Sequence, residues 1–167
     1  MNKKSLSVFH GNCKKDFFRS LKWAWQRATK GYCDRDAWDL DDFYTRLFVV
    51  TLRNLGMNCI SSPEKYCANS PKGDELQVWR ERLFEMSILF EDYLEENRNA
   101  KNEYYSQYME CIRNRNWEDF ISGKRSPEEE KLGKLYNERQ INITAESIKG
   151  LHKAFDMLKE DFIYLWD

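Results

Sequence analysis

Residues 74–97 read DELQVWRERLFEMSILFEDYLEEN, and the spacing of the apolar residues in this stretch decides the fold class. The apolar positions are Leu76, Trp79, Leu83, Met86, Phe90, Tyr93 and Leu94, and the acidic positions on the other side are Glu85, Asp92, Glu95 and Glu96. Apolar residues three and four positions apart share one face of an α-helix. We therefore predict a helix that opens at Asp74 and ends near Asn97.

Toward the N-terminus the same periodicity predicts two more helices. The first spans about 15–30, and Gly31 should end it because glycine readily adopts the left-handed conformation that follows a helix. The second should be capped by Asp36, with Asp39 at its third position, and should run to the residue before Gly56.

Toward the C-terminus we predict helices over about 100–121 and 126–139 and a last one that begins at Thr144. The first of these should bend at residues 114–116, where two asparagines flank an arginine. Ser126-Pro127-Glu128-Glu129 is a helix-start pattern, with the serine as cap, proline at the first helical position and Glu129 closing the capping box.

Most of the connections between these helices are short. Short connections favour antiparallel neighbours, so we predict an all-α, single-domain bundle of five or six helices, mostly antiparallel, over residues 1–167. Residues 1–14 are expected to form a mobile arm. Residues 57–73 contain several Ser, Pro and Gly breakers and are expected to form a long loop.

Charge is distributed unevenly along the chain. Residues 1–35 hold nine Lys or Arg against two Asp, a charge of +7, although the whole chain has a net charge of −1. Such a segment favours nucleic acid, an anionic partner or the acidic remainder of the same fold. The acidic remainder argues against a dedicated nucleic-acid-binding protein, whose domain is usually basic throughout.

The five cysteines are odd in number and have no tight pairing, which predicts free thiols. They are Cys13, Cys33, Cys59, Cys67 and Cys111. No stretch approaches the ~20 apolar residues of a membrane-spanning helix, and the N-terminus is too polar for a secretory signal. We expect a cytoplasmic protein with no membrane partner.

Five carboxylates lie close together in residues 34–42, so we ask whether they could bind a metal ion. They are Asp34, Asp36, Asp39, Asp41 and Asp42. Oxygen ligands suit a hard divalent cation, but these acids spread around a turn and a helix start, and no Glu-x-x-His partner accompanies them. Nucleophile-elbow and phosphate-binding glycine motifs are absent as well. We predict no enzyme, no catalytic residue, no metal site and no cofactor.

Protein recognition accounts for more of the unusual features. In the first predicted helix Trp23 falls on the face away from the stripe formed by Phe17, Leu21 and Trp25, so it needs a second layer or a partner. Binding hot spots are commonly formed by aromatic residues that charged residues surround. The candidate partner-binding residues are Trp23, Arg27, Tyr32, Asp34, Asp41, Asp42, Tyr104 and Tyr105.

Two further readings stay open. Arg19, Arg27 and Tyr32 could sequester a small anionic nucleotide without turnover, and the acidic segment could serve a metal-dependent, phosphate-directed enzyme. A homo-oligomer is a second kind of partner, because the last helix carries a heptad-like seam. The seam residues are Ile148, Leu151, Phe155, Leu158, Phe162 and Leu165.

Three blocks of the chain together resemble small bacteriophage-encoded helical proteins of unassigned function. The first runs from Trp25 and Arg27 through the GYxDxDxWxLD pattern of residues 31–41. The second is the WxxxLxxMxxxFE pattern of residues 79–91, and the third is the closing LWD of residues 165–167. The resemblance implies a phage protein that works in the cytoplasm of an infected bacterium. Together with the small size, the missing catalytic motifs and the bipolar, aromatic-rich composition, it favours an accessory protein that binds a host protein, such as a component of antiviral defence. It implies no catalytic residues.

Overall fold

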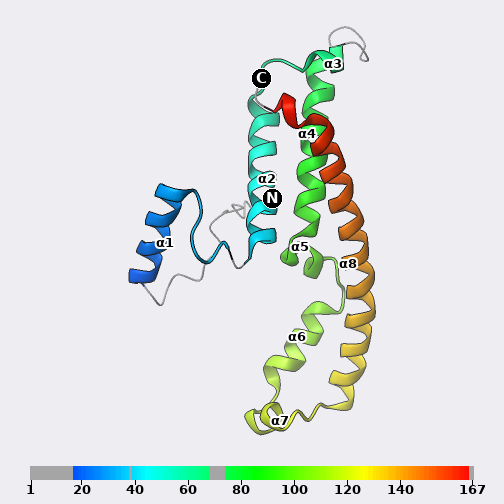
Figure 1. Ribbon diagram of the computed structural model, residues 1–167. Helices are drawn as coiled ribbons and strands as arrows, with labels where there is room; N and C mark the ends of the chain where they lie inside the picture. The colour runs from blue at the N-terminus through cyan, green and yellow to red at the C-terminus, as the bar shows by residue number, and fades with distance from the viewer. Residues whose placement is uncertain (1–16, 38, 68–73, 166–167) are drawn as a thin grey trace.

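The computed structural model describes residues 17–37, 39–67 and 74–165, and every regular element within these ranges is helical (Figure 1). The helices are α1 (Phe17–Lys30), α2 (Leu40–Asn58), α3 (Glu64–Cys67), α4 (Glu75–Tyr93), α5 (Glu95–Ala100), α6 (Tyr105–Asn114), α7 (Trp117–Ser122), α8 (Pro127–Asp161) and the short 3₁₀-helix η2 (Phe162–Tyr164). The predicted all-α class is confirmed. Five or six helices were expected, and the described ranges contain eight α-helices because two predicted helices are divided, two are merged and α3 is additional.

The core lies between three long helices, with α4 in the middle. α4 packs against α2 on one side and α8 on the other, and it runs opposite to both (Figure 1). Trp79, Leu83, Met86 and Phe90 of α4 are at most 2% exposed, as the periodicity of residues 74–97 predicts. The neighbours that complete the core are Val49, Leu52, Cys59, Ala154, Met157 and Leu158. Burial of these apolar side chains supplies the main favourable contribution to folding.

The start of α2 differs from the prediction. Asp36 was expected to cap this helix, but its carboxylate accepts hydrogen bonds from Arg27 and from the Cys33 N–H instead. Asp39, expected at the third helical position, occupies the N-cap position, and its side chain makes no capping hydrogen bond. A pairing partner from the preceding helix has therefore displaced the local capping interaction.

Gly56 does not end α2, which continues to Asn58. A Cβ atom at Gly56 would meet the ring of Phe84 at 3.2 Å, so the glycine lets α2 approach α4 closely. The long loop predicted over 57–73 is shortened accordingly, because residues 57–58 belong to α2 and residues 64–67 form α3. Residues 68–73 and the predicted arm over 1–14 lie outside the described ranges.

The helix predicted from Asp74 to Asn97 is broken at Leu94. Leu94 has an extended backbone, with ψ at 140°, and its side chain is only 1% exposed. The chain therefore turns from α4 into α5 while Leu94 stays in the protein interior. The Glu91 carbonyl at the end of α4 accepts hydrogen bonds from the Leu94 N–H at 3.1 Å and from the side-chain amide of Asn97 at 2.8 Å.

The bend predicted at residues 114–116 is present. α6 ends at Asn114, and the Asn116 side chain caps α7 by accepting a hydrogen bond from the Asp119 N–H at 2.7 Å. α6 packs against the N-terminal half of α8, where the rings of Tyr108 and Tyr136 stack with centroids 5.0 Å apart. This pairing extends the molecule beyond the three-helix core (Figure 1).

Ser126 caps α8 as predicted, since its hydroxyl accepts a hydrogen bond from the Glu129 N–H at 3.1 Å. The Glu129 carboxylate, expected to close a capping box, accepts hydrogen bonds from the Arg115 guanidinium. The predicted interruption between residue 139 and Thr144 is wrong, because α8 is a single helix of 35 residues. Neither Gly nor Pro occurs in residues 134–149, and the burial of Ile143 keeps the predicted gap helical.

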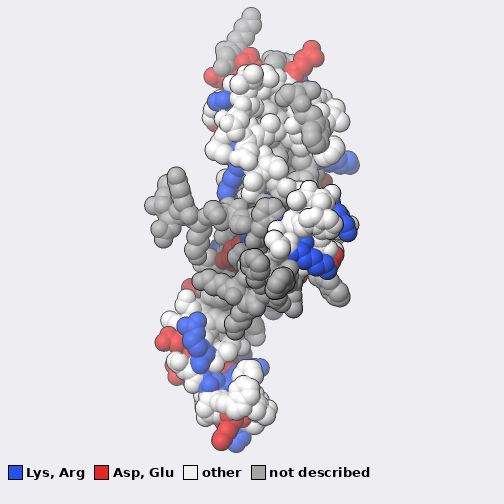
Figure 2. All heavy atoms as spheres, turned by 90° about the vertical axis from the view of Figure 1, so that its left-hand side faces the viewer, with Lys and Arg blue, Asp and Glu red and all other residues white. Residues whose placement is uncertain are grey.

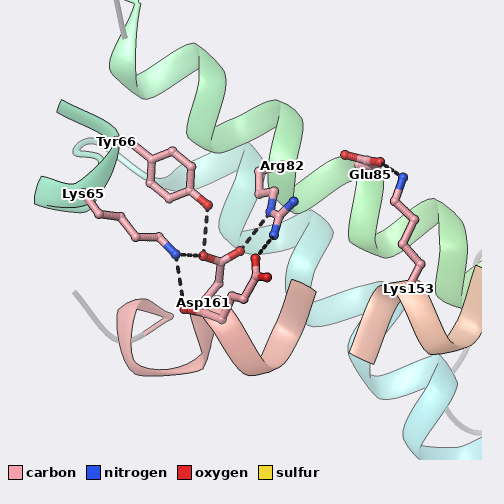
Figure 3. A network of polar contacts seen from close by, with 7 residues as sticks. Lys65, Tyr66, Arg82, Glu85, Lys153 and Asp161 are labelled. Atoms are coloured by element: carbon pink, nitrogen blue, oxygen red, sulfur yellow. Dashed lines mark hydrogen bonds and ion pairs between the residues drawn. The ribbon is translucent and has the colours of Figure 1, made fainter. Parts of the chain in front are cut away.

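A buried ion network joins α3, α4 and α8 at the end of the bundle where α8 finishes (Figure 3). The Asp161 carboxylate is fully buried, and it accepts hydrogen bonds from Tyr66 Oη at 2.9 Å, from Arg82 Nε at 2.9 Å and from Lys65. Burial acts to raise the pKa of Asp161, but its three donors outweigh burial and hold the pKa below its ordinary value.

The seam predicted on the last helix divides into two stripes. Leu158 belongs to the core, and Leu151 and Leu165 are partly buried against it. Ile148, Phe155 and Phe162 are 40–50% exposed. Among the described residues of the predicted seam, this second stripe is the more exposed one.

Cys33, Cys59 and Cys111 are free thiols, as expected. Cys13 and the side chain of Cys67 lie outside what the structure describes. No helix in the part of the chain that the structure describes has the length and apolar character needed to cross a bilayer.

Candidate protein-binding site

The GYxDxDx pattern of residues 31–37 forms a turn that clasps α1 from its polar side. Gly31, with φ at 81°, ends α1 as predicted, and its N–H donates to the Arg27 carbonyl at 3.0 Å. The Asp34 carboxylate accepts hydrogen bonds from Lys22 Nζ at 2.8 Å and from Gln26 Nε2 at 2.9 Å. These contacts bring the turn back along the helix that precedes it.

Asp36 provides the second half of the clasp. Its carboxylate accepts two hydrogen bonds from the Arg27 guanidinium, at 2.9 Å and 2.6 Å, and one from the Cys33 N–H at 2.8 Å. The side chains of Arg27 and Asp36 are 15% and 7% exposed, so water screens this fork-shaped pair only weakly. We call α1 together with residues 31–37 the α1 clasp.

The α1 clasp reverses the usual orientation of an amphipathic helix. Gln26, on the polar side, is only 6% exposed, whereas Leu21 and Trp25 of the apolar stripe are 57% and 64% exposed. Trp23, expected to lie on the outer face, is half-buried, with the Arg35 guanidinium 5.7 Å from its ring centroid. The turn thus supplies a second layer over Trp23, and Trp25 is the more exposed tryptophan of this helix.

α1 lies beside the bundle and has no extensive contact with α2, α4 or α8 (Figure 1). On the side where α1 projects, basic side chains border an uncharged surface (Figure 2). The helix contains Arg19, Lys22, Arg27 and Lys30 and no acidic residue. Its outward face is thus apolar with a basic edge, a combination suited to contact with another helical surface.

An acidic depression of about 630 Å³ adjoins the α1 clasp. It is lined by residues from the turn, α2, α4, α5 and α6, among them Arg35, Asp36, Asp39, Asp41, Asp42, Arg46, Tyr93, Glu95, Glu96, Arg98 and Tyr105. Arg46 is 5% exposed and is held by Asp42 at 2.7 Å and by Glu96 at 2.6 and 2.9 Å. Within the described residues no three His, Cys, Asp or Glu side chains are grouped so that they could hold a metal ion.

The structure divides the predicted site residues among these features. Trp23, Arg27, Tyr32 and Asp34 belong to the α1 clasp, and Asp41, Asp42 and Tyr105 line the acidic depression. Tyr104 is half-buried just before α6, and its N–H donates to the Asn102 side chain. The side chain of Arg19 and residues Trp38 and Trp166 lie outside what is described.

Sequence reasoning missed Leu21 and Trp25 as surface residues. An apolar stripe is normally buried, and periodicity alone does not reveal that a turn will cover the opposite face. The available signal was the pairing of Lys22, Gln26 and Arg27 with acids that follow within one short turn.

Comparisons with protein-family models, curated proteins and solved structures return no match.

The α1 clasp should open at low pH. The hydrogen bonds from Lys22 and Gln26 lower the pKa of Asp34, and at Asp36 those from Arg27 and Cys33 outweigh burial, which acts to raise the pKa. Both pKa values therefore lie below the ordinary value of 3.8. The stabilisation is complete above pH 3.8 and is lost as pH falls through the lower folded pKa.

The Cys33 amide resonance in an NMR titration should report this opening, because its N–H donates to Asp36. We expect its shift to move with a midpoint below pH 3.8. In Asp36→Asn the same resonance should not titrate there, and the Leu83 amide, deep in the core, serves as the control for global unfolding. A midpoint at or above 3.8 would contradict the ion-paired clasp.

Proposed function

We propose that this protein acts by non-catalytic binding to a protein partner, through the apolar face of α1. The observation that carries the proposal is the outward orientation of Leu21 and Trp25 on a helix whose polar side is covered by its own turn. Exposed apolar surface of this kind commonly marks an interaction site. A tryptophan near its centre suits the role of a binding hot spot.

The partner that fits this face has an apolar groove with an acidic edge. An amphipathic helix lays its apolar stripe in such a groove, with anchors at positions i, i+4 and i+7. In α1 these positions are Leu21, Trp25 and Ala28. The basic residues of α1 would meet the acidic edge, which favours fast association and a strong dependence on salt.

The resemblance to bacteriophage-encoded helical proteins gives this proposal its setting. It supports an accessory protein in the cytoplasm of an infected bacterium, where the partner is a host protein such as a component of antiviral defence. The alternative of nucleotide sequestration uses Arg19, Arg27 and Tyr32. The binding of the Arg27 guanidinium to Asp36 gives that alternative less support.

The double substitution Leu21→Glu with Trp25→Glu should abolish stoichiometric recovery of the partner from infected cells, because two charges would enter the apolar contact. With the purified partner, calorimetry should show affinity lowered by about a hundredfold or more, equivalent to about 2.7 kcal/mol. Both side chains are more than half exposed, so the melting temperature should change little.

A matched control substitutes Trp117→Glu with Ile121→Glu, on α7, where the side chains are 72% and 68% exposed. This variant should recover the partner as the unmodified protein does. Equal recovery by the α1 variant and the unmodified protein would overturn the proposal, as would loss of the partner in the α7 variant alone.

A further inference from the structure

A second apolar surface lies between α2 and α8. These two helices both pack against α4 and have no extensive contact with each other. The space between them is a groove of about 470 Å³, lined by Leu40, Asp41, Tyr44, Thr45, Tyr93, Leu151 and Phe155. Leu40 and Tyr44 are each 48% exposed and Phe155 is 45% exposed. We call it the α2–α8 groove.

The rings of Phe48, Phe90 and Phe155 meet where α2, α4 and α8 come together. Phe48 stacks on Phe90 with centroids 4.9 Å apart, and Phe155 meets Phe90 edge-on at 5.1 Å. Exposed apolar residues recur every seven positions along α8 and into η2, at Ile141, Ile148, Phe155 and Phe162. This stripe spans roughly 31 Å, and a helix as long as α1 spans roughly 21 Å. The exposed stripe that passes through the groove at Phe155 is therefore longer than α1.

We propose that α1 of a second copy of this chain lies in the α2–α8 groove, so that two copies form a dimer with exchanged N-terminal helices. The inference rests on the proposed function and adds its regulation. In the dimer, the groove of the second copy would cover the apolar face of α1. A partner that binds this face would displace the groove.

Charge and polarity favour α1 as the occupant. The groove shares Asp41 and Tyr93 with the acidic depression, so an apolar surface passes directly into one where carboxylates outnumber arginines. α1 has the complementary composition, with Leu21 and Trp25 exposed on one side, and its basic residues outnumber the two aspartates of the turn that pair with Lys22 and Arg27. Opposite potentials on the two surfaces would also set the direction in which α1 enters.

The α1 clasp favours a second copy over the helix of the same chain. The bonds from Lys22, Gln26 and Arg27 to the turn cover the polar side of α1, and α1 lies beside its own bundle (Figure 1). Folding α1 onto its own groove would require these bonds to be broken or the whole unit to swing about the start of α2. Exchange leaves the bonds intact, and a two-fold arrangement closes with two identical interfaces.

The test is the mass of the full chain by native mass spectrometry and by light scattering at high micromolar concentration. We expect a dimer. An α1 variant, Leu21→Glu with Trp25→Glu, and a groove variant, Leu40→Glu with Tyr44→Glu, should each be monomeric, because each destroys one side of both interfaces. All four side chains are about half or more exposed, so the variants should fold, and circular dichroism verifies this.

Mixing the two variants distinguishes a dimer with exchanged α1 helices from other dimers. A heterodimer of the α1 variant and the groove variant retains one intact interface, so mixing two monomers should produce a heterodimer of intermediate mass. Ile121→Glu on α7 should leave the homodimer unchanged. A monomeric unmodified protein, variants that remain dimeric, or a mixture without heterodimer would overturn the inference.

These outcomes are independent of partner capture. A monomeric protein that still recovers its partner through Leu21 and Trp25 would remove the exchanged dimer and leave the proposed function in place. A protein that dimerises by exchange but recovers no partner would remove the proposed function alone.

Discussion

Replacing Asp161 by alanine should lower the free energy of unfolding by about 3 kcal/mol, a loss typical of breaking a buried ion pair from one side. The carboxylate is fully buried and is the shared acceptor for Lys65, Tyr66 and Arg82 (Figure 3). Its removal would leave two cations and a phenol without that acceptor. The side chains of Lys65 and Arg82 are 32% and 25% exposed, so water would compensate part of the loss. Urea denaturation measures the change.

Glu160→Ala is the matched control, because Glu160 binds the same arginine but is 65% exposed. This exposed pair should contribute less than about 1 kcal/mol. Equal losses in the two variants would contradict the central role of Asp161. The stability of the unmodified protein should also fall as pH drops through the lowered pKa of Asp161, and in Asp161→Ala this part of the pH dependence should be missing.

The network also has a topological role. Lys65 and Tyr66 belong to α3, Arg82 belongs to α4 and Asp161 is the last residue of α8. One carboxylate therefore joins the end of α8 to two consecutive helices that lie far earlier in the sequence. Loss of Asp161 should therefore loosen α3 and the end of α8 before the rest of the bundle. Hydrogen exchange in these segments would detect the local opening.

Apolar periodicity predicts the structure correctly where the periodic residues are also the buried ones. In α4 the predicted apolar positions Trp79, Leu83, Met86 and Phe90 are the core of the protein. The break after α4 was missed because Leu94 carries no breaker signal. Its extended conformation comes with burial of its own side chain, which only the tertiary structure provides.

Local rules failed where a more distant partner competed. Asp36 has the residue type and position of a helix cap, but Arg27, nine positions earlier, binds it bidentately. Thr144 resembles a cap as well, yet its neighbour Ile143 is 2% exposed and helical, so α8 continues through both. An ion pair in the first case and side-chain burial in the second outweighed a capping interaction worth about 1 kcal/mol.

The candidate site shows the same limit. The acids and aromatic residues of residues 31–42 were recognised as informative, but their grouping into a clasp and a depression depends on how α1 and α5 are placed. The exposure of Trp25 could not be read from a helical wheel, because the wheel gives two faces without saying which one the chain will cover.

Replacing Phe90 by alanine should lower the free energy of unfolding by about 4 kcal/mol, within the range measured for Phe→Ala in protein cores. Phe90 is fully buried on α4, and its ring contacts Phe48 of α2 and Phe155 of α8. Its loss would leave a cavity where the three core helices meet. Denaturant unfolding should show a lower midpoint with an unchanged slope, because the folded state keeps its extent of burial.

Phe155→Ala is the control for Phe90→Ala, since it removes the same ring chemistry from a side chain that is 45% exposed. We expect this loss to be about 1–2 kcal/mol, because the partly exposed ring gains less from burial and its site can fill with water. For dimerisation we expect the reverse order, with the larger effect in Phe155→Ala. Phe155 lines the α2–α8 groove directly, so its removal should weaken exchange of α1 while the fold persists. Equal destabilisation by the two substitutions would mean that Phe155 is part of the core, and the groove would then be closed in solution.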